Sequence, residues 1–225
     1  MNAAERALKK QQKLEAENAR LDGLAGFDKE LAGTGRIICG VDEVGRGPLA
    51  GPVVAGAVIL PDDPEIIHLL SGLNDSKKVS EKKREVLYDL IAKYSAAWAV
   101  GESDNVRIDE INVLQADLEA MTGAVHALKI RPDVLLLDAV KIPQLSDYEQ
   151  KSIIKGDAKS AVIAAASIMA KVTRDRFMVR AAEIYPQYGF ERNKGYGTAE
   201  HIAALKEYGP CPLHRRSFIG HFVEV

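Results

Sequence analysis

The sequence predicts an α/β fold in which helices flank a mixed β-sheet. Short, β-branched apolar runs alternate with longer segments whose apolar residues recur at helical spacing. Two early runs, 36–41 and 53–60, are separated only by a turn rich in glycine and proline, which favours an antiparallel hairpin. A later run, 133–139, is apolar almost throughout, as expected of a strand buried on both faces, so we expect parallel pairing there.

Residues 3–31 are rich in Ala, Glu, Lys, Gln and Leu, which are good helix formers. Two glycines at 33 and 35 then interrupt the pattern. We therefore expect residues 1–35 to form a solvated helical extension, and residues 36–225 to form the main domain. A helix that docks on a partner is the alternative interpretation of the extension.

Capping residues and breakers place the other elements. Ser80 can cap a helix, and Pro132 and Pro186 stop the helices that precede them. In chain order, the further predicted elements are a helix over 80–94, a strand over 96–102, a helix over 109–129, the buried strand over 133–139, a brief strand, a helix from about Lys159 to Tyr185, and a helix over 197–209.

Composition limits the function classes. The 225 residues carry a formal charge of −2, so any surface for nucleic acid must be local rather than global. Cys39 and Cys211 lack metal-type spacing and are expected to be reduced thiols. We see neither a signal-peptide core nor an apolar stretch of membrane-spanning length. We expect a soluble, cytoplasmic protein with no membrane association.

Four acids stand at the ends of predicted elements. Asp42 and Glu43 follow the first strand, Asp138 ends the buried strand, and Asp157 precedes the long helix, whose dipole would favour an ionised carboxylate. If the strands of Asp42 and Asp138 are neighbours, their carboxylates share one site. Crowded carboxylates repel one another unless cations neutralise them, and oxygen ligands select Mg²⁺ or Mn²⁺. Two such ions about 3.5–4 Å apart form a clamp used in phosphodiester hydrolysis.

Two questions about these acids remain open at this stage. Adjacent strand residues point to opposite faces, so Asp42 and Glu43 can share a site only if the strand ends or bulges there, or if Glu43 offers its carbonyl. As a hypothesis, Asp42 bridges the ions and Glu43 binds from the flank. Alternatively, each acid merely caps a helix or pairs with a base. Asp175 lies about 27 Å from Asp157 along one helix, so we expect it in an exposed ion pair with Arg174, Arg176 or another base.

Basic residues cluster in two stretches that could neutralise phosphates, although a solvated charged face is the alternative. They are Lys77, Lys78, Lys82, Lys83 and Arg84 in the first stretch, and Arg192, Lys194, Arg215 and Arg216 in the second. The five histidines show no metal or dyad spacing, which disfavours metal-free chemistry through paired histidines.

Five motifs occur in order: "CGVDEVGRGPLAGPVVAGAVIL", "LNDSKKVS", "LLLDAV", "KGDAKSAVIAAASIMAKVTRDR" and "NKGYGT". Together they resemble bacterial ribonuclease HII, from about Arg36 to Phe218. The resemblance implies a ribonuclease H-like fold with a five-stranded mixed sheet, which makes 36–225 the catalytic domain. It further implies an endonuclease that cuts the RNA strand of RNA–DNA hybrids and incises 5′ to single ribonucleotides in duplex DNA, by two-metal catalysis with Mn²⁺ or Mg²⁺, leaving 3′-hydroxyl and 5′-phosphate ends.

The resemblance also implies roles for individual residues. Asp42, Glu43, Asp138 and Asp157 would be the catalytic, metal-binding acids. Gly45, Arg46 and Gly47 would read the 2′-hydroxyl at the RNA–DNA junction. Tyr196 would pack on the next deoxyribose, and Lys77 would contact the nucleic-acid backbone. Without the resemblance, the glycine loop could be a plain tight turn and the tyrosine a half-buried aromatic. Glycines let backbone groups approach a 2′-hydroxyl closely, and an arginine can fork onto a phosphate.

Three rivals remain. Ribonuclease HIII is disfavoured because that family carries a different glycine loop, a glutamate as its last acid and a large N-terminal domain. A non-cleaving hybrid-binding module is disfavoured by the four intact acids. A recombinase-type nuclease on the same fold would cut all-DNA substrate. We expect a monomer whose partner is an RNA–DNA hybrid or duplex DNA containing ribonucleotides.

Overall fold

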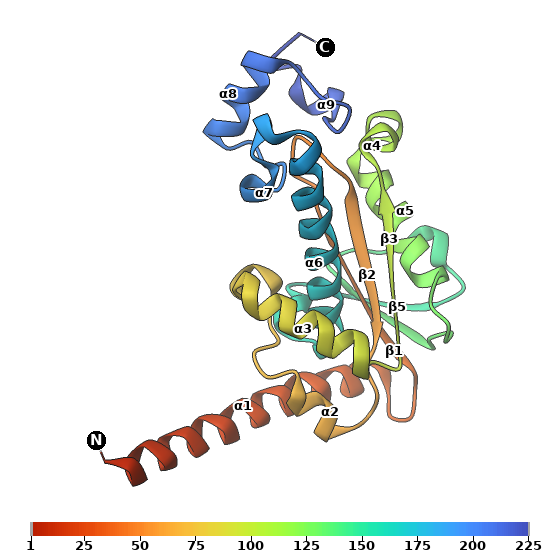
Figure 1. The fold of residues 1–225 in the computed structure, drawn as a ribbon. Helices are drawn as coiled ribbons and strands as arrows, with labels where there is room; N and C mark the ends of the chain where they lie inside the picture. The colour runs from red at the N-terminus through yellow and green to blue at the C-terminus, as the bar shows by residue number, and fades with distance from the viewer. Residues whose placement is uncertain (1, 225) are drawn as a thin grey trace.

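The computed structural model of the chain describes residues 2–224. Five strands form one mixed sheet in the order β3-β2-β1-β4-β5 (Figure 1). Their bounds are β1 (Ile38–Val44), β2 (Val53–Ile59), β3 (Ala97–Ser103), β4 (Val134–Asp138) and β5 (Glu149–Ile153). β1 pairs antiparallel with β2, and β2 with β3, whereas β4 lies parallel to both β1 and β5. The predicted hairpin, buried central strand and mixed sheet are confirmed.

Helices cover both faces of the sheet. The helices of the described residues are α1 (Ala3–Ala32), α2 (Pro64–Leu69), α3 (Glu81–Tyr94), α4 (Asn105–Ile111), α5 (Val113–His126), α6 (Ala161–Ile184), α7 (Phe190–Asn193), α8 (Ala199–Tyr208) and α9 (Arg216–Ile219). The last three lie beyond the end of the sheet (Figure 1). The long α6 packs on β1 and β2, and α5 packs on β2 and β3 from the opposite face. The contact with α6 is close at Gly56, where a Cβ atom would lie 2.4 Å from the carbonyl oxygen of Ala166.

The helix predicted over 109–129 is two helices instead of one. Asn112 separates α4 from α5 with a φ of 68°, in the left-handed region. Its side-chain oxygen accepts hydrogen bonds from the N–H groups of Leu114 and Gln115, so it caps α5. Asparagine tolerates left-handed backbone and caps helices well, which explains the break inside a continuous apolar pattern.

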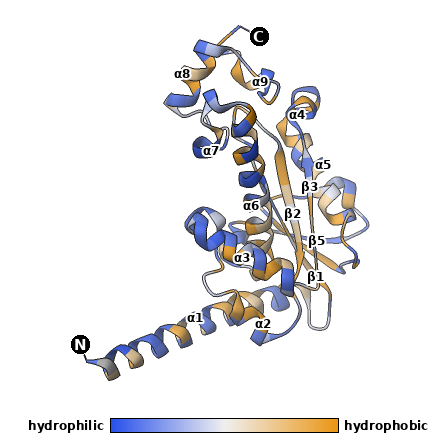
Figure 2. Cartoon of the chain, viewed as in Figure 1, coloured by the Kyte–Doolittle hydropathy of each residue, from blue (hydrophilic) through white to orange (hydrophobic). Residues whose placement is uncertain are grey.

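The N-terminal helix is solvated over only part of its length. Its first half is exposed and projects from the body, whereas Leu21, Leu24 and Ala32 in its second half are buried (Figure 1). Hydrophobic colouring is concentrated on the strands of the sheet (Figure 2). Because Leu21, Leu24 and Ala32 are buried, the prediction of a solvated extension is wrong for the second half of α1, which contributes to the core. Within residues 2–224, none of the helices combines the length and apolar character needed to span a membrane.

Candidate active site

The register of the sheet brings Asp42 and Asp138 to neighbouring strands. β1 pairs in parallel with β4 through Val41 and Leu137, and the next residues along each strand are these two acids. β4 ends at Asp138, while β1 continues to Val44 along β2. The last residues of β1 therefore have β2 on one side and lie beyond the end of β4 on the other.

The open question about alternation has a different answer from the one expected. β1 neither ends nor bulges at the acid pair, because Asp42 pairs with Gly56 and Glu43 with Ala55 in regular register. The side chain of Asp42 is buried against Ser167 of α6. Glu43, on the opposite face, lies near Arg46. The charge of Asp138 still acts on both acids, because β4 stops at that residue and no further strand separates the three groups.

Burial and mutual repulsion perturb these acids. Burial raises the pKa of Asp42 well above its usual range, and the charges of Glu43 and Asp138 raise it further. Burial also raises the pKa of Glu43; the charge of Arg46 opposes this shift, and that of Asp138 adds to it. An oxygen of Asp138 accepts a hydrogen bond of 2.8 Å from the N–H of Gly156. This bond ties the end of β4 to the turn that carries Asp157.

Asp157 lies in the 3₁₀ turn Gly156–Ala158, and Ser160 rather than Asp157 caps α6. Burial raises its pKa, and the carboxyl groups of Asp75 and Asp138 raise it further, whereas the charge of Lys77 lowers it. Burial and the neighbouring acids thus oppose the ionisation of Asp157 that the helix dipole was expected to favour. Asp75, in the "LNDSKKVS" motif, lies beside Asp157, a neighbour that the sequence did not reveal.

The donor set fits a hard divalent cation. It consists of carboxylate oxygens that are buried at Asp42 and half-buried at the other acids, close enough to repel one another, and only partly compensated by Arg46 and Lys77. In the described part of the chain, no three His, Cys, Asp or Glu side chains are already arranged to hold one ion. Binding would therefore require the carboxylates to turn toward a shared cation.

The glycine loop lies against the segment that carries Tyr196. Gly45 has a φ of 101°, and a Cβ atom there would lie 2.4 Å from Nε of Arg174. A Cβ atom on Gly47 would lie 4.0 Å from the Tyr196 ring, which is 40% exposed. The predicted junction-reading residues are thus brought together on one surface. Lys77 is exposed, and its backbone N–H bonds to Asp75.

Two buried arginines hold this loop. Arg215 donates hydrogen bonds to the carbonyls of Gly45, Arg46 and Gly51, and Arg174 donates to those of Ala50, Pro52 and Lys194. Arg215 is fully buried, and Lys194 is buried as well. The prediction that Arg215 and Lys194 neutralise phosphates is therefore wrong, since Arg215 is enclosed and Lys194 is mostly covered, with its Nζ near Glu81.

Asp175 is buried rather than exposed. It pairs with Lys171 at 2.7 Å and with Arg84 at 3.5 Å, so the predicted ion pair with a base is present, but it is buried. Arg84 is thereby engaged in the interior and is only 13% exposed, so it too is removed from the predicted phosphate-binding stretch.

Two histidines do form a pair, contrary to the sequence interpretation. The Nε2 atoms of His201 and His214 lie 3.0 Å apart, and Nδ1 of His201 bonds to the carbonyl of Tyr196. Both rings are buried against Tyr188 and Phe190. The pair thus joins α8 to the C-terminal segment inside the core and supports the Tyr196 loop.

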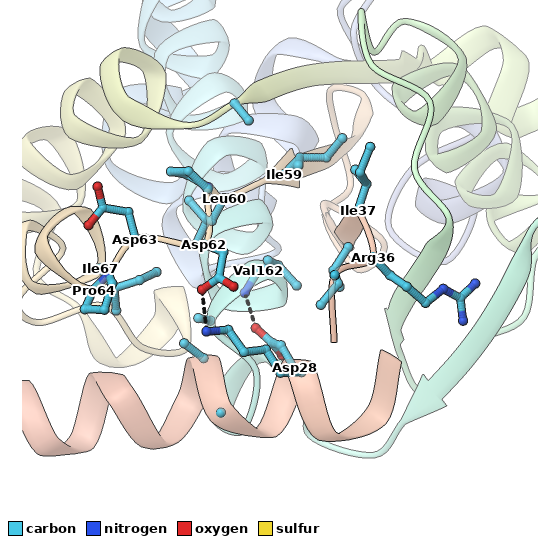
Figure 3. Close-up of a pocket in the computed structure, with 18 of the residues that line it drawn as sticks. Asp28, Arg36, Ile37, Ile59, Leu60, Asp62, Asp63, Pro64, Ile67 and Val162 are labelled. Atoms are coloured by element: carbon cyan, nitrogen blue, oxygen red, sulfur yellow. Dashed lines mark hydrogen bonds and ion pairs between the residues drawn. The ribbon is translucent and has the colours of Figure 1, made fainter. Parts of the chain in front are cut away.

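A cavity of about 510 Å³ lies between α1 and the body, lined by residues other than the four acids. Figure 3 shows Asp28 of α1 at its floor, where its carboxylate accepts a hydrogen bond of 3.1 Å from the N–H of Val162 in the first turn of α6. Asp62, on the opposite part of the lining, forms an ion pair with Lys29 of α1. The N-terminal helix therefore contacts the helix that follows Asp157.

Comparison with known proteins identifies the family. The family model described as Ribonuclease HII matches residues 39–221. A ribonuclease HII of Lachnoclostridium phytofermentans is 56% identical over 208 residues, which are 92% of this chain and 80% of that protein.

Two solved structures share the fold. Ribonuclease H2 from Pyrococcus horikoshii OT3 gives a TM-score of 0.65 at 30% identity, over 80% of this chain and 92% of that one. The ribonuclease HII of Archaeoglobus fulgidus, solved in a complex with PCNA, gives 0.70 at 25% identity, over 82% and 94%. The chain therefore belongs to the ribonuclease HII family and is an endoribonuclease that hydrolyses RNA in RNA–DNA hybrids.

Proposed function

We propose that this endonuclease also incises duplex DNA on the 5′ side of single embedded ribonucleotides, leaving 3′-hydroxyl and 5′-phosphate ends. One observation carries the catalytic part of the proposal. The register of β1 and β4 sets Asp42 beside Asp138 at the point where β4 ends. At such a strand end the two carboxylates can turn toward a cation held beside a phosphodiester backbone, while the strands keep their main chains in place.

Asp42, Glu43, Asp138 and Asp157 would hold two Mg²⁺ or Mn²⁺ ions. When bound, such ions lower the pKa of a water molecule and stabilise the leaving oxygen. The raised pKa values of Asp42, Glu43 and Asp157 support this assignment, because a bound cation would counter both the burial and the repulsion that raise them. Asp75 adds a further negative charge beside Asp157.

The glycine loop and Tyr196 would select the junction. A 2′-hydroxyl both donates and accepts hydrogen bonds, so backbone groups at Gly45 and Gly47 can recognise it if they approach closely. Because Arg215 fixes the carbonyls of Gly45 and Arg46, the loop is held in one conformation before substrate binds. The exposed face of Tyr196 beside Gly47 offers a flat apolar surface for the neighbouring sugar.

The test is cleavage of a labelled duplex that contains one ribonucleotide, in Mg²⁺ and in Mn²⁺, with the cut mapped. We expect one cut 5′ to the ribonucleotide, and no cut in the all-DNA duplex. Asp42→Asn and Asp138→Asn should bind the duplex but lose cleavage, whereas Asp147→Asn, at an exposed ion pair with Arg131, should cleave normally. Appreciable cleavage by Asp138→Asn in Mg²⁺ would remove that residue from the proposed site.

The remaining proposals concern the setting. We propose that the protein acts as a monomer in the cytoplasm, where its thiols stay reduced. Cys39 and Cys211 are both free and buried, which supports a reducing compartment without requiring one. Sedimentation of the protein at micromolar concentration, alone and with a hybrid duplex, tests the oligomeric state.

A further inference from the structure

An unassigned carboxylate lies next to the active site. Asp117 projects from α5 and has no exposed surface. Neither of its carboxylate oxygens has a hydrogen-bond partner among the described residues. Burying a carboxylate without a hydrogen bond destabilises the folded protein. A nearby cation therefore has a strong effect on the free energy of the ionised carboxylate.

That partner is Arg46 of the glycine loop. Its Nε lies 3.7 Å from Oδ2 of Asp117, and its Nη1 lies 3.6 Å from Oε1 of Glu43. The guanidinium thus lies between Asp117 and a proposed metal ligand, slightly beyond hydrogen-bond distance of each. Half of the Arg46 side chain is exposed, so its outer edge can reach a bound duplex.

The backbone and the side chain of Arg46 are controlled separately. Arg215 fixes the backbone through a 3.0 Å hydrogen bond to the Arg46 carbonyl. The direction of the side chain depends on the two carboxylates that flank it. If a cation occupies Glu43, the attraction of that acid for the guanidinium weakens. Asp117 then remains as the anion that orients Arg46.

We propose that Asp117 is a positioning residue: it anchors the Nε edge of Arg46 so that the outer edge of the guanidinium meets a phosphate of the bound substrate. This inference rests on the proposed role of the glycine loop in substrate binding. The buried acid does not touch substrate itself. It acts by keeping a flexible arginine in one rotamer, which reduces the entropy lost when the phosphate binds.

The test is a double-mutant cycle on a long RNA–DNA hybrid, a substrate class that the family assignment already supplies. The variants are Asp117→Asn, Arg46→Gln and the double variant. Glu119→Gln, at an exposed position of α5, is the matched control. We expect Asp117→Asn and Arg46→Gln each to raise KM by about tenfold with little change in kcat, as for the loss of one charge-assisted contact. The double variant should be no worse than Arg46→Gln alone.

Two further measurements separate positioning from folding. Asp117→Asn should be at least as stable as the wild type in urea, because it removes a buried carboxylate whose oxygens make no hydrogen bond among the described residues. The slope of log KM against log salt concentration should become shallower in Asp117→Asn and in Arg46→Gln. In Arg46→Gln the change should be about one, as for the loss of one phosphate contact. Wild-type KM in Asp117→Asn, or KM effects that multiply in the double variant, would overturn the proposal. Failure to incise embedded ribonucleotides would contradict the junction proposal alone, because this cycle uses the long hybrid.

Discussion

Replacement of Arg215 by lysine tests whether a buried arginine holds the glycine loop. The guanidinium makes four hydrogen bonds of 2.6–3.0 Å to three carbonyls, those of Gly45, Arg46 and Gly51. Lysine keeps the charge but lacks the planar fork that spans these acceptors. We expect the ammonium group to satisfy one of the three carbonyls and to leave two without a donor.

The expected loss of stability follows from these two acceptors. Each buried acceptor left unsatisfied costs about 1–3 kcal/mol, so the variant should lose about 2–6 kcal/mol of the free energy of unfolding. With a urea m-value of about 2–3 kcal/mol/M, a loss near the middle of this range lowers the midpoint by about 1–2 M.

The assay is urea denaturation followed by circular dichroism, with Arg216→Lys as the matched control. Arg216 is the adjacent residue and is exposed, so its replacement should change stability by less than about 0.5 kcal/mol. Incision of embedded ribonucleotides should also fall in folded Arg215→Lys, because the loop that we propose to read the junction loses its support. Equal midpoints for Arg215→Lys and Arg216→Lys would refute the reasoning.

Three other outcomes are expected. Gly45→Ala should destabilise the protein, because a Cβ atom at φ 101° meets Arg174, and a wild-type thermal midpoint would contradict this. The pKa of His214 is lowered to about 4 in the folded state, so between pH 6.5 and 4 the unfolded state binds more protons, and the free energy of unfolding should fall by up to about 3 kcal/mol. Urea denaturation of wild type and His214→Gln across this pH range measures the contribution of this histidine. A difference in stability that stays constant with pH would contradict the prediction. Burial raises the pKa of Asp28 to about 7, so the wild type loses stability as the pH rises from about 4 to 7 and the buried carboxyl must ionise. The stability of Asp28→Asn relative to wild type should therefore rise over this range. A difference that does not depend on pH would show that Asp28 titrates normally.

The sequence allowed the sheet and the four acids to be predicted because both depend on local patterns. Alternating and continuous apolar runs identified the strands, and acids at strand ends stood out against them. The break at Asn112 was missed because the apolar spacing continues across it. Its left-handed backbone and side-chain cap became evident only in three dimensions.

The structural roles of Asp117 and Arg215 could not be predicted for a different reason. Asp117 lies within a helix, where an acid in the sequence is usually taken as solvated, and its neighbours Glu43 and Arg46 are far away along the chain. Arg215 is more than 160 residues from the carbonyls of the loop that it holds. Burial of a charged side chain depends on such distant partners, so residue type alone could not distinguish these groups from surface charges.

The central claim is that acids from separate elements converge to bind divalent cations. The most direct measurement is anomalous diffraction from crystals soaked in Mn²⁺, with Ca²⁺-soaked crystals as a comparison. We expect manganese peaks at coordination distance from carboxylate oxygens of both Asp42 and Asp138, with Asp157 and Glu43 at the same cluster. Manganese bound elsewhere, with Asp42 and Asp138 free of metal, would contradict the claim.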